Sequence, residues 1–200
     1  MPIIAQNNGG SNIEPIAAGS YASRCYSMIQ IGTITENILG TEKELHKVRI
    51  SWELPDELEV FKEENGPQPR VISEEYTLSL NDKANLRKML QSWRGKAFTD
   101  EEANAFDITV LVGKPCLLSI SQKQSKKGNT FSYISGVSLL PKGMQCPPQI
   151  NPSQVLSFDA WDDELFNNLP DFIKEKIKSS QEYKTKFNEV ITDLDGNPIF

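Results

Sequence analysis

Apolar and polar residues alternate along several stretches of the first 140 residues, which is the period of half-buried β-strands. The clearest alternation covers residues 45–54, where Val48, Ile50 and Trp52 share one face and polar side chains fill the other. Similar segments rich in aromatic and β-branched residues are separated by residues that favour turns. The predicted strands cover residues 21–35, 45–54, 70–80, 111–122 and 130–140.

A helical period replaces this alternation between the third and fourth predicted strands. The apolar residues from Leu86 to Trp93 recur at the spacing of one helix face. Asn81 is a suitable N-cap for this helix, and Gly95 is a suitable residue to end it. A second, short helix is expected over residues 100–106.

Three strands, a helix and two further strands predict an all-β domain with a connecting helix. This β-β-β-α-β-β order is the plan of the five-stranded, partly open OB-fold barrel. We expect the barrel over residues 20–142, preceded by a flexible N-terminal arm, residues 1–19. Residues 143–200 are expected to form a proline-containing linker, a short helix within residues 169–187 and an acidic C-terminal tail.

Charge is distributed unevenly along the chain, whose formal net charge is -6. Residues 151–200 hold five lysines and ten acidic residues, whereas residues 70–150 hold eleven basic and seven acidic residues. Net charge governs solubility and long-range steering, so a local basic surface is compatible with an acidic chain. The middle of the chain is therefore basic and the end acidic.

Residues that would support catalysis or metal binding are few. His46 is the single histidine, and Cys25, Cys116 and Cys146 are widely spaced. Zinc needs closely arranged ligands, and the sequence has no hydrolase, metalloprotease or phosphate-loop motif. We therefore expect a non-enzymatic protein with buried free thiols, without metal or cofactor. Without a signal peptide or a membrane-spanning apolar run, it is expected to be cytoplasmic.

Single-stranded nucleic acid requires a positive groove for phosphates and aromatic rings on which bases stack. Phe131 and Tyr133 share one strand face and follow a lysine-rich loop, and this loop of OB-folds commonly grips nucleic acid. Alternatively, these two rings and Trp52 belong to the core, and the lysines belong to a solvated turn. The candidate nucleic-acid-binding residues are Tyr21, Arg24, Tyr26, Lys47, Arg49, Trp52, Lys123, Lys126, Lys127, Phe131 and Tyr133.

The chain ends in DLDGNPIF, residues 193–200. An acidic tip with a terminal aromatic residue suits a basic, apolar-lined pocket on a partner protein. A β-turn at Asp195 and Gly196 is the alternative interpretation. The candidate partner-binding residues are Asp193, Asp195, Pro198, Ile199 and Phe200.

With these segments identified, the chain resembles single-stranded DNA-binding proteins of phages and prophages that have the OB-fold. The likeness covers residues 21–184, and the segments that carry it are SWELP, ISEEYTLSL, NLRKMLQSWRGKAFT, GKPCLLSI, LPKGMQCPPQINP and LPDFIKEKIKSSQEYK. Separately, the ending resembles the tip of bacterial single-stranded DNA-binding proteins, with Pro198 and Ile199 in reversed order.

The resemblance implies a protein of the bacterial host cytoplasm that acts in phage-type DNA replication or recombination. Its expected partners are single-stranded DNA and, through the tail, replication or recombination proteins; a homo-oligomer is left open. The composition and the pattern together favour binding that does not depend on DNA sequence. Two alternatives are a structural or interaction barrel and a recombinase that anneals strands.

Overall fold

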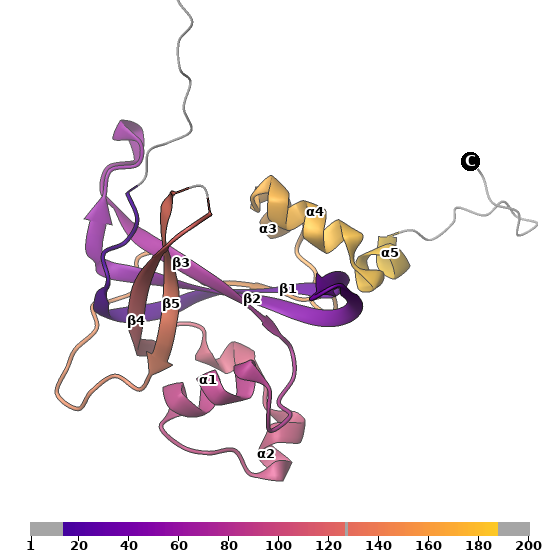
Figure 1. The fold of residues 1–200 in the computed structure, drawn as a ribbon. Helices are drawn as coiled ribbons and strands as arrows, with labels where there is room; N and C mark the ends of the chain where they lie inside the picture. Colours follow the sequence, from indigo (N-terminus) through magenta and orange to yellow (C-terminus); the bar gives the residue numbers. More distant parts are fainter. Residues whose placement is uncertain (1–13, 127, 188–200) are drawn as a thin grey trace, which may run out of the picture.

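The computed structural model describes residues 14–126 and 128–187, which form one six-stranded sheet with helices on both sides (Figure 1). The strands are β1 (Gly19–Ile38), β2 (Thr41–Glu59), β3 (Gln68–Thr77), β4 (Pro115–Gln124), β5 (Thr130–Ser138) and β6 (Gln154–Leu156). The helices are α1 (Asn85–Arg94), α2 (Asp100–Ala105), α3 (Asp163–Asn168), α4 (Asp171–Ser179) and α5 (Gln181–Phe187), with short 3₁₀ turns at Glu63–Asn65 and Ile108–Leu111. The five predicted strands and the helix between the third and fourth are confirmed, and the fold is β-rich.

β1 organises the sheet because different parts of it pair with different strands. Arg24–Ile38 runs antiparallel to β2, and Gly19–Arg24 runs antiparallel to β4. The short strand β6, which the sequence pattern did not predict, lies parallel to β1 at Ser27–Ile29. The strand order is β3-β2-β1-β4-β5, and the two end strands, β3 and β5, contact each other.

The larger core lies between the strands and α1. The alternation of β2 places Val48, Ile50 and Trp52 in this core, and Leu90 and Trp93 of α1 pack against them. The ring centres of Trp52 and Trp93 are 5.9 Å apart. Burying a large apolar side chain stabilises the fold by roughly 1.5–3 kcal/mol, so the apolar face of β2 contributes strongly.

α1 begins three residues later than the sequence pattern indicated. The predicted N-cap, Asn81, instead lies in a turn in which its carbonyl accepts a hydrogen bond from the N–H of Ala84. Ala84 is the N-cap and makes no side-chain capping bond, so the prediction for Asn81 was wrong. The prediction for Gly95 is confirmed, because it ends α1 with a φ of 68°, a left-handed conformation that glycine adopts without strain.

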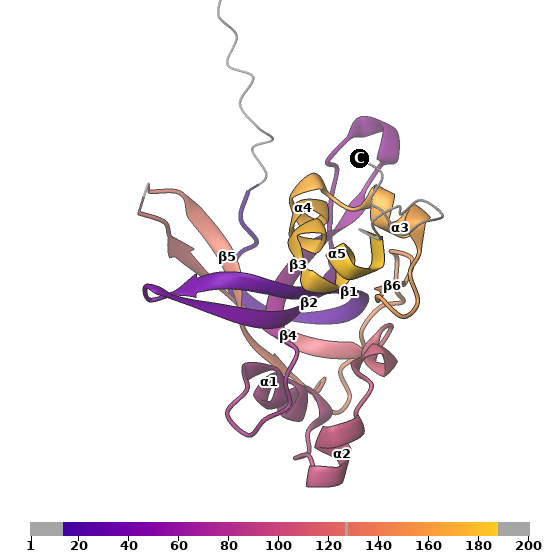
Figure 2. The same cartoon turned by 90° about the vertical axis from the view of Figure 1, so that its right-hand side faces the viewer.

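Residues after Pro152 form a second layer on the side of β1 opposite α1 and α2 (Figures 1 and 2). Ile29, Ile31 and Ile34 of β1 pack there against α3, α4 and α5. β1 is therefore apolar on both faces over this stretch because both faces are covered. The single helix predicted over residues 169–187 is two helices.

Ser180 causes the break between α4 and α5. It ends α4 in an extended conformation, and its Oγ accepts a hydrogen bond from the N–H of Tyr183 in the first turn of α5. A serine oxygen that bonds to the free N–H groups of a helix start is a typical cap. The chain can therefore turn while both helices stay packed on β1.

Polar contacts fasten this second layer to the sheet. The buried carboxylate of Glu53 accepts hydrogen bonds from the N–H groups of Ile150 and Asn151, at 2.7 and 2.8 Å. Glu182 of α5 accepts from the N–H and the hydroxyl of Thr33. Beside this contact Gly32 has a φ of +91°, and a Cβ atom there would lie 2.6 Å from Glu182 Oε2. Much of the predicted linker and tail region is thus built onto the sheet.

The described end of the predicted N-terminal arm also packs on the sheet. The side chain of Ile16 is buried in the larger core. Its carbonyl accepts hydrogen bonds from Gln122 of β4 and Ser132 of β5, at 2.9 and 2.7 Å. The N-terminal segment therefore contacts the face of the β4–β5 hairpin that carries Gln122 and Ser132, and it does not contact the opposite face through these bonds.

Candidate nucleic-acid interface

The face of the β4–β5 hairpin that points away from the core carries a lysine and two aromatic rings. Cross-strand pairing sets Lys123 opposite Phe131 and Ser121 opposite Tyr133. The Lys123 ammonium lies 5.1 Å from the ring centre of Phe131 and 4.7 Å from that of Tyr133, both within cation–π range. Phe131 is 40% exposed and Tyr133 is half-buried. We call Lys123, Phe131 and Tyr133 the hairpin cluster.

A tight turn extends this surface. The N–H of Ser125 donates to the carbonyl of Asn129 at 2.8 Å, and Gly128 supplies the left-handed conformation with a φ of 84°. Lys126 is exposed within the turn, and the candidate Lys127 lies outside the described residues. The tips of the β4–β5 and β1–β2 hairpins project to the same side of the molecule (Figure 2).

Basic candidates on β2 are engaged by carboxylates. Lys47 Nζ lies 2.6 Å from Glu36 Oε1 and 3.9 Å from Glu75 Oε2. Arg49 Nη1 lies 3.5 Å from Glu75 Oε1. The ammonium group of Lys176, from α4, also contacts Glu75, at 2.8 Å. Lys47 and Arg49 thus face the same surface, but a phosphate would have to compete with Glu75 for them.

Two further candidates hold the fold together. The Arg24 guanidinium donates hydrogen bonds to the backbone carbonyls of Gly113, Cys146 and Pro147, which fastens the segment after β5 to β1. The Tyr21 hydroxyl donates to the carbonyl of Ala17 at 2.8 Å, and its ring packs on the larger core. Their hydrogen-bonding groups are therefore already engaged within the protein.

Trp52 and Tyr26 have different environments. Trp52 is fully buried in the larger core, so no base can stack on it, and its prediction as a binding residue is corrected. Tyr26 is half-buried at an irregularity in the pairing of β1 with β2. Burial raises the pKa of its phenol, and the charge of Glu53 adds to this shift. Tyr26 is therefore a neutral side chain beside the charged face of β2.

β3 connects the hairpin cluster with the charges on β2. Burial raises the pKa of Glu74, and Lys123 is the cation that opposes this shift most strongly, ahead of Arg49 and Lys47. The next residue, Glu75, contacts the cations of β2 and α4. Carboxylates of one strand thus lie near both groups of basic residues.

Glu75, Phe172 and Lys176 also belong to this surface, and the sequence pattern did not indicate them. Phe172 is 55% exposed, and the Arg49 guanidinium lies 5.6 Å from its ring centre. A signal was available, because Phe172 and Lys176 are four residues apart and therefore share one side of a helix. The contact with β2 could not be inferred from that spacing. The candidate partner-binding residues Asp193, Asp195, Pro198, Ile199 and Phe200 lie outside the described residues.

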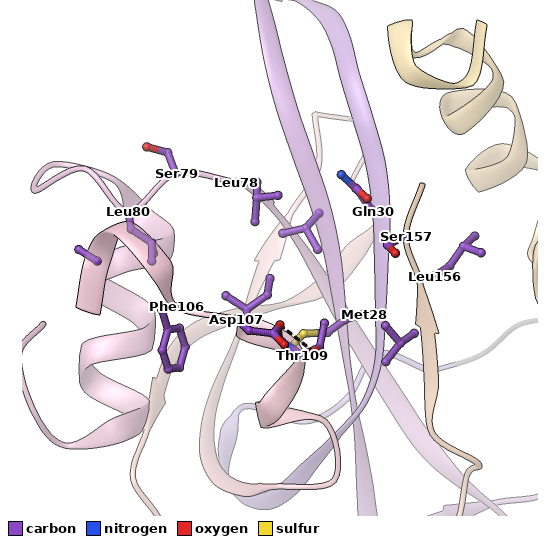
Figure 3. Close-up of a pocket in the computed structure, with 14 residues that line it drawn as sticks. Met28, Gln30, Leu78, Ser79, Leu80, Phe106, Asp107, Thr109, Leu156 and Ser157 are labelled. Carbon is purple, nitrogen blue, oxygen red and sulfur yellow. Dashed lines mark hydrogen bonds between the residues drawn. The ribbon is translucent and has the colours of Figure 1, made fainter. Parts of the chain in front are cut away.

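An apolar pocket of about 390 Å³ opens on the side of β1 that faces α2. It lies between the 3₁₀ turn after α2 and the segment around β6 (Figure 3). Met28, Phe106 and Leu156 contribute apolar walls. Two of its polar groups bind neighbouring protein atoms: the Asp107 carboxylate accepts from Thr109, and the Gln30 amide contacts Phe158 N–H. These bonds hold the segments that surround the pocket.

Within residues 14–126 and 128–187, no three His, Cys, Asp or Glu side chains are arranged so that they could hold a metal ion. The same part of the chain has no helix with the length and apolar character needed to cross a membrane.

Comparison with known proteins finds no family model that matches the chain and no similar protein among the curated ones. The functional conclusion therefore depends on the hairpin cluster, its charges and its neighbours.

Proposed function

We propose that this protein binds single-stranded DNA without sequence preference, on the outward face of the β4–β5 hairpin. The observation that carries the proposal is the hairpin cluster, in which Lys123 lies against the rings of Phe131 and Tyr133. Every base offers a π-face to a ring, and a cation beside the ring can contact the adjoining phosphate. Stacking of this kind tolerates any sequence.

The arrangement of the strands supports an OB-type barrel as the framework. β1 pairs with both β2 and β4, a helix follows β3, and β3 contacts β5 at the two ends of the strand order. In OB-folds, oligonucleotides bind across the second and third strands between the first and the last hairpin loops. The hairpin cluster, Arg49 and Glu75 occupy the corresponding elements of this chain.

Single strands are favoured over duplex because the bases of a duplex are already stacked on one another. An aromatic ring on a hairpin gains stacking energy only from a base that is free to leave its neighbours. The resemblance to phage and prophage proteins adds a biological setting, namely DNA replication or recombination in the cytoplasm of a bacterial host. The acidic tail would recruit other proteins of these processes.

Fluorescence titration with a labelled oligonucleotide, single-stranded and duplex, tests the proposal. We expect tighter binding to the single strand and a log–log salt slope of about -0.7 for each phosphate that is neutralised. Phe131→Ala and Tyr133→Ala should each weaken binding by roughly 1–3 kcal/mol. Phe61→Ala is the matched control, because Phe61 is also 40% exposed but lies in the loop between β2 and β3.

Three results would reject this proposal. Equal or tighter binding to duplex would rule out stacking as its source. Equal loss of affinity in Phe61→Ala and Phe131→Ala would show that the hairpin is not the binding site. A wild-type chain that binds neither the single strand nor the duplex would instead be a structural or interaction barrel. Melting curves of each variant separate lost binding from lost folding.

A further inference from the structure

Helix α4 carries aromatic and basic side chains that contact β2 and β3. Ile173 and Ile177 are buried against β1, which fixes the orientation of the helix. Phe172 and Lys176, one position before each, share the neighbouring side of α4. Phe172 is largely exposed beside the Arg49 guanidinium, and Lys176 reaches Glu75. We call Arg49, Phe172 and Lys176 the α4 surface.

The α4 surface has the same chemical make-up as the hairpin cluster. Each combines an exposed phenylalanine with a cation near its ring, at 5.6 Å for Arg49 and Phe172 and at 5.1 Å for Lys123 and Phe131. In both, the aromatic ring is accessible while the cation remains close enough to contact a phosphate. The two surfaces come from segments far apart in the sequence.

Both surfaces border β3 on the same side of the sheet. The β4–β5 hairpin and α4 rise on that side of the β1–β2 ribbon in both views (Figures 1 and 2). β3 contacts β5, and Glu75 of β3 contacts the α4 surface. A single strand of DNA that leaves the hairpin cluster and crosses β3 would therefore arrive at α4.

Glu75 occupies the position that a phosphate would take at the α4 surface. Its side chain is 15% exposed, and its two oxygens contact Lys176 at 2.8 and 3.0 Å. Arg49 and Lys47 approach the same carboxylate at 3.5 and 3.9 Å. Three cations gathered around one oxyanion form a set that also suits a phosphate group. The carboxylate therefore competes with such a ligand.

We propose that α4 is a second contact for the single-stranded nucleic acid, in which Phe172 stacks on a base and Arg49 and Lys176 exchange Glu75 for a phosphate. This inference rests on the proposed function of the hairpin cluster and extends its binding path across β3. It assigns nucleic-acid contacts to the C-terminal layer and gives Glu75 a role in limiting affinity.

Affinity measurements on the full chain with a single-stranded oligonucleotide of about 15 nucleotides test the path. Phe172→Ala should weaken binding about fivefold or more, whereas Phe61→Ala should leave it unchanged. Lys176→Ala should weaken binding more than Lys178→Ala, which removes the same charge from the same helix. Glu75→Gln should tighten binding severalfold, and Glu64→Gln, which removes an equal charge from the β2–β3 loop, should do so less.

The outcomes separate the two proposals. If the wild-type chain does not bind single strands, the proposed function itself fails. If Phe131→Ala weakens binding but Phe172→Ala and Lys176→Ala bind like their controls, the function stands and the α4 contact is overturned. A Glu75→Gln variant that folds with an unchanged melting temperature and does not bind more tightly would overturn the competition between Glu75 and phosphate.

Discussion

Chemically similar residues differ in what they can bind because their partners differ. Arg24 and Lys123 are both cations on strands, but the Arg24 guanidinium donates to three backbone carbonyls, whereas the Lys123 ammonium lies over two rings on an exposed hairpin. Trp52 and Phe131 are both aromatic, but Trp52 is buried in the core. Contacts of this kind, and not residue type, separate structural from binding positions.

The contribution of the Glu102 side chain to stability is expected to depend on pH. Its carboxylate forms a capping box with Thr99 and contacts Lys96 and Arg94 at 2.8 and 2.9 Å. The bond from Lys96 and the backbone bond from Thr99 are the main causes that lower the pKa of Glu102 to about 2. Because the folded pKa lies below the unfolded value of about 4.3, the ionised form stabilises the fold above that pH.

We therefore expect Glu102→Gln to lower the melting temperature at pH 7 and to matter less as the pH falls from about 4 to about 2. Thermal unfolding of both proteins across this range measures the difference, which should be modest because solvent and salt screen the exposed pairs. A difference that stays constant from pH 7 to pH 2 would show that the charge of Glu102 is unimportant.

Helices and strands fit together in the C-terminal layer through a close approach at Gly32. Gly32 and Gly40 both have left-handed backbones, with φ values of 91° and 85°. A Cβ atom at Gly40 would have no neighbour within 4 Å, whereas one at Gly32 would clash with Ser180 and Glu182. Replacing either glycine would strain the backbone, but only a side chain at Gly32 would also collide with α5 and the residue before it.

Gly32→Ala should consequently destabilise the protein more than Gly40→Ala, by about 1–3 kcal/mol, the usual cost of overpacking a close contact. Urea unfolding of the two variants measures this difference. Limited proteolysis should also cut the second layer faster in Gly32→Ala. Equal stabilities would mean that α5 moves aside without cost and that its contact with Gly32 is not important for packing.

For the whole molecule, the proposed division is between a sheet that binds DNA together with α4 and a tail that binds proteins. Deleting residues 193–200 should leave the melting temperature unchanged and should not weaken DNA binding, because the deletion removes two acidic residues and no basic residue. It should abolish the proposed recruitment of replication or recombination proteins. Phe200→Ala alone should cause most of that loss by emptying an apolar anchor pocket on the partner.

Pull-downs from infected-cell extract with the wild-type, Phe200→Ala and truncated chains measure recruitment. Asp193→Asn together with Asp195→Asn serves as a comparison, since it removes the charge and keeps the terminal Phe200. Identical partner sets for all the proteins would contradict the role of the tail. A truncated chain that melts at a markedly lower temperature would show instead that the tail belongs to the fold.

Local patterns in the sequence determined the five main strands, α1 and α2, because alternation and helical spacing follow from the geometry of each segment. They also placed Phe131 and Tyr133 on one strand face. They could not determine that Arg24 binds carbonyls or that Glu75 pairs with Lys176, since each contact depends on segments far apart in the chain.

The C-terminal layer is the largest feature that only the tertiary structure decided. Prolines at Pro147, Pro148 and Pro152 indicated a linker, and the segment after them had a helical pattern without a visible partner. Its partner is the second apolar face of β1, which becomes available because β6 and Glu53 hold the following chain against the sheet. A pattern records which side of an element is apolar, but packing decides what covers it.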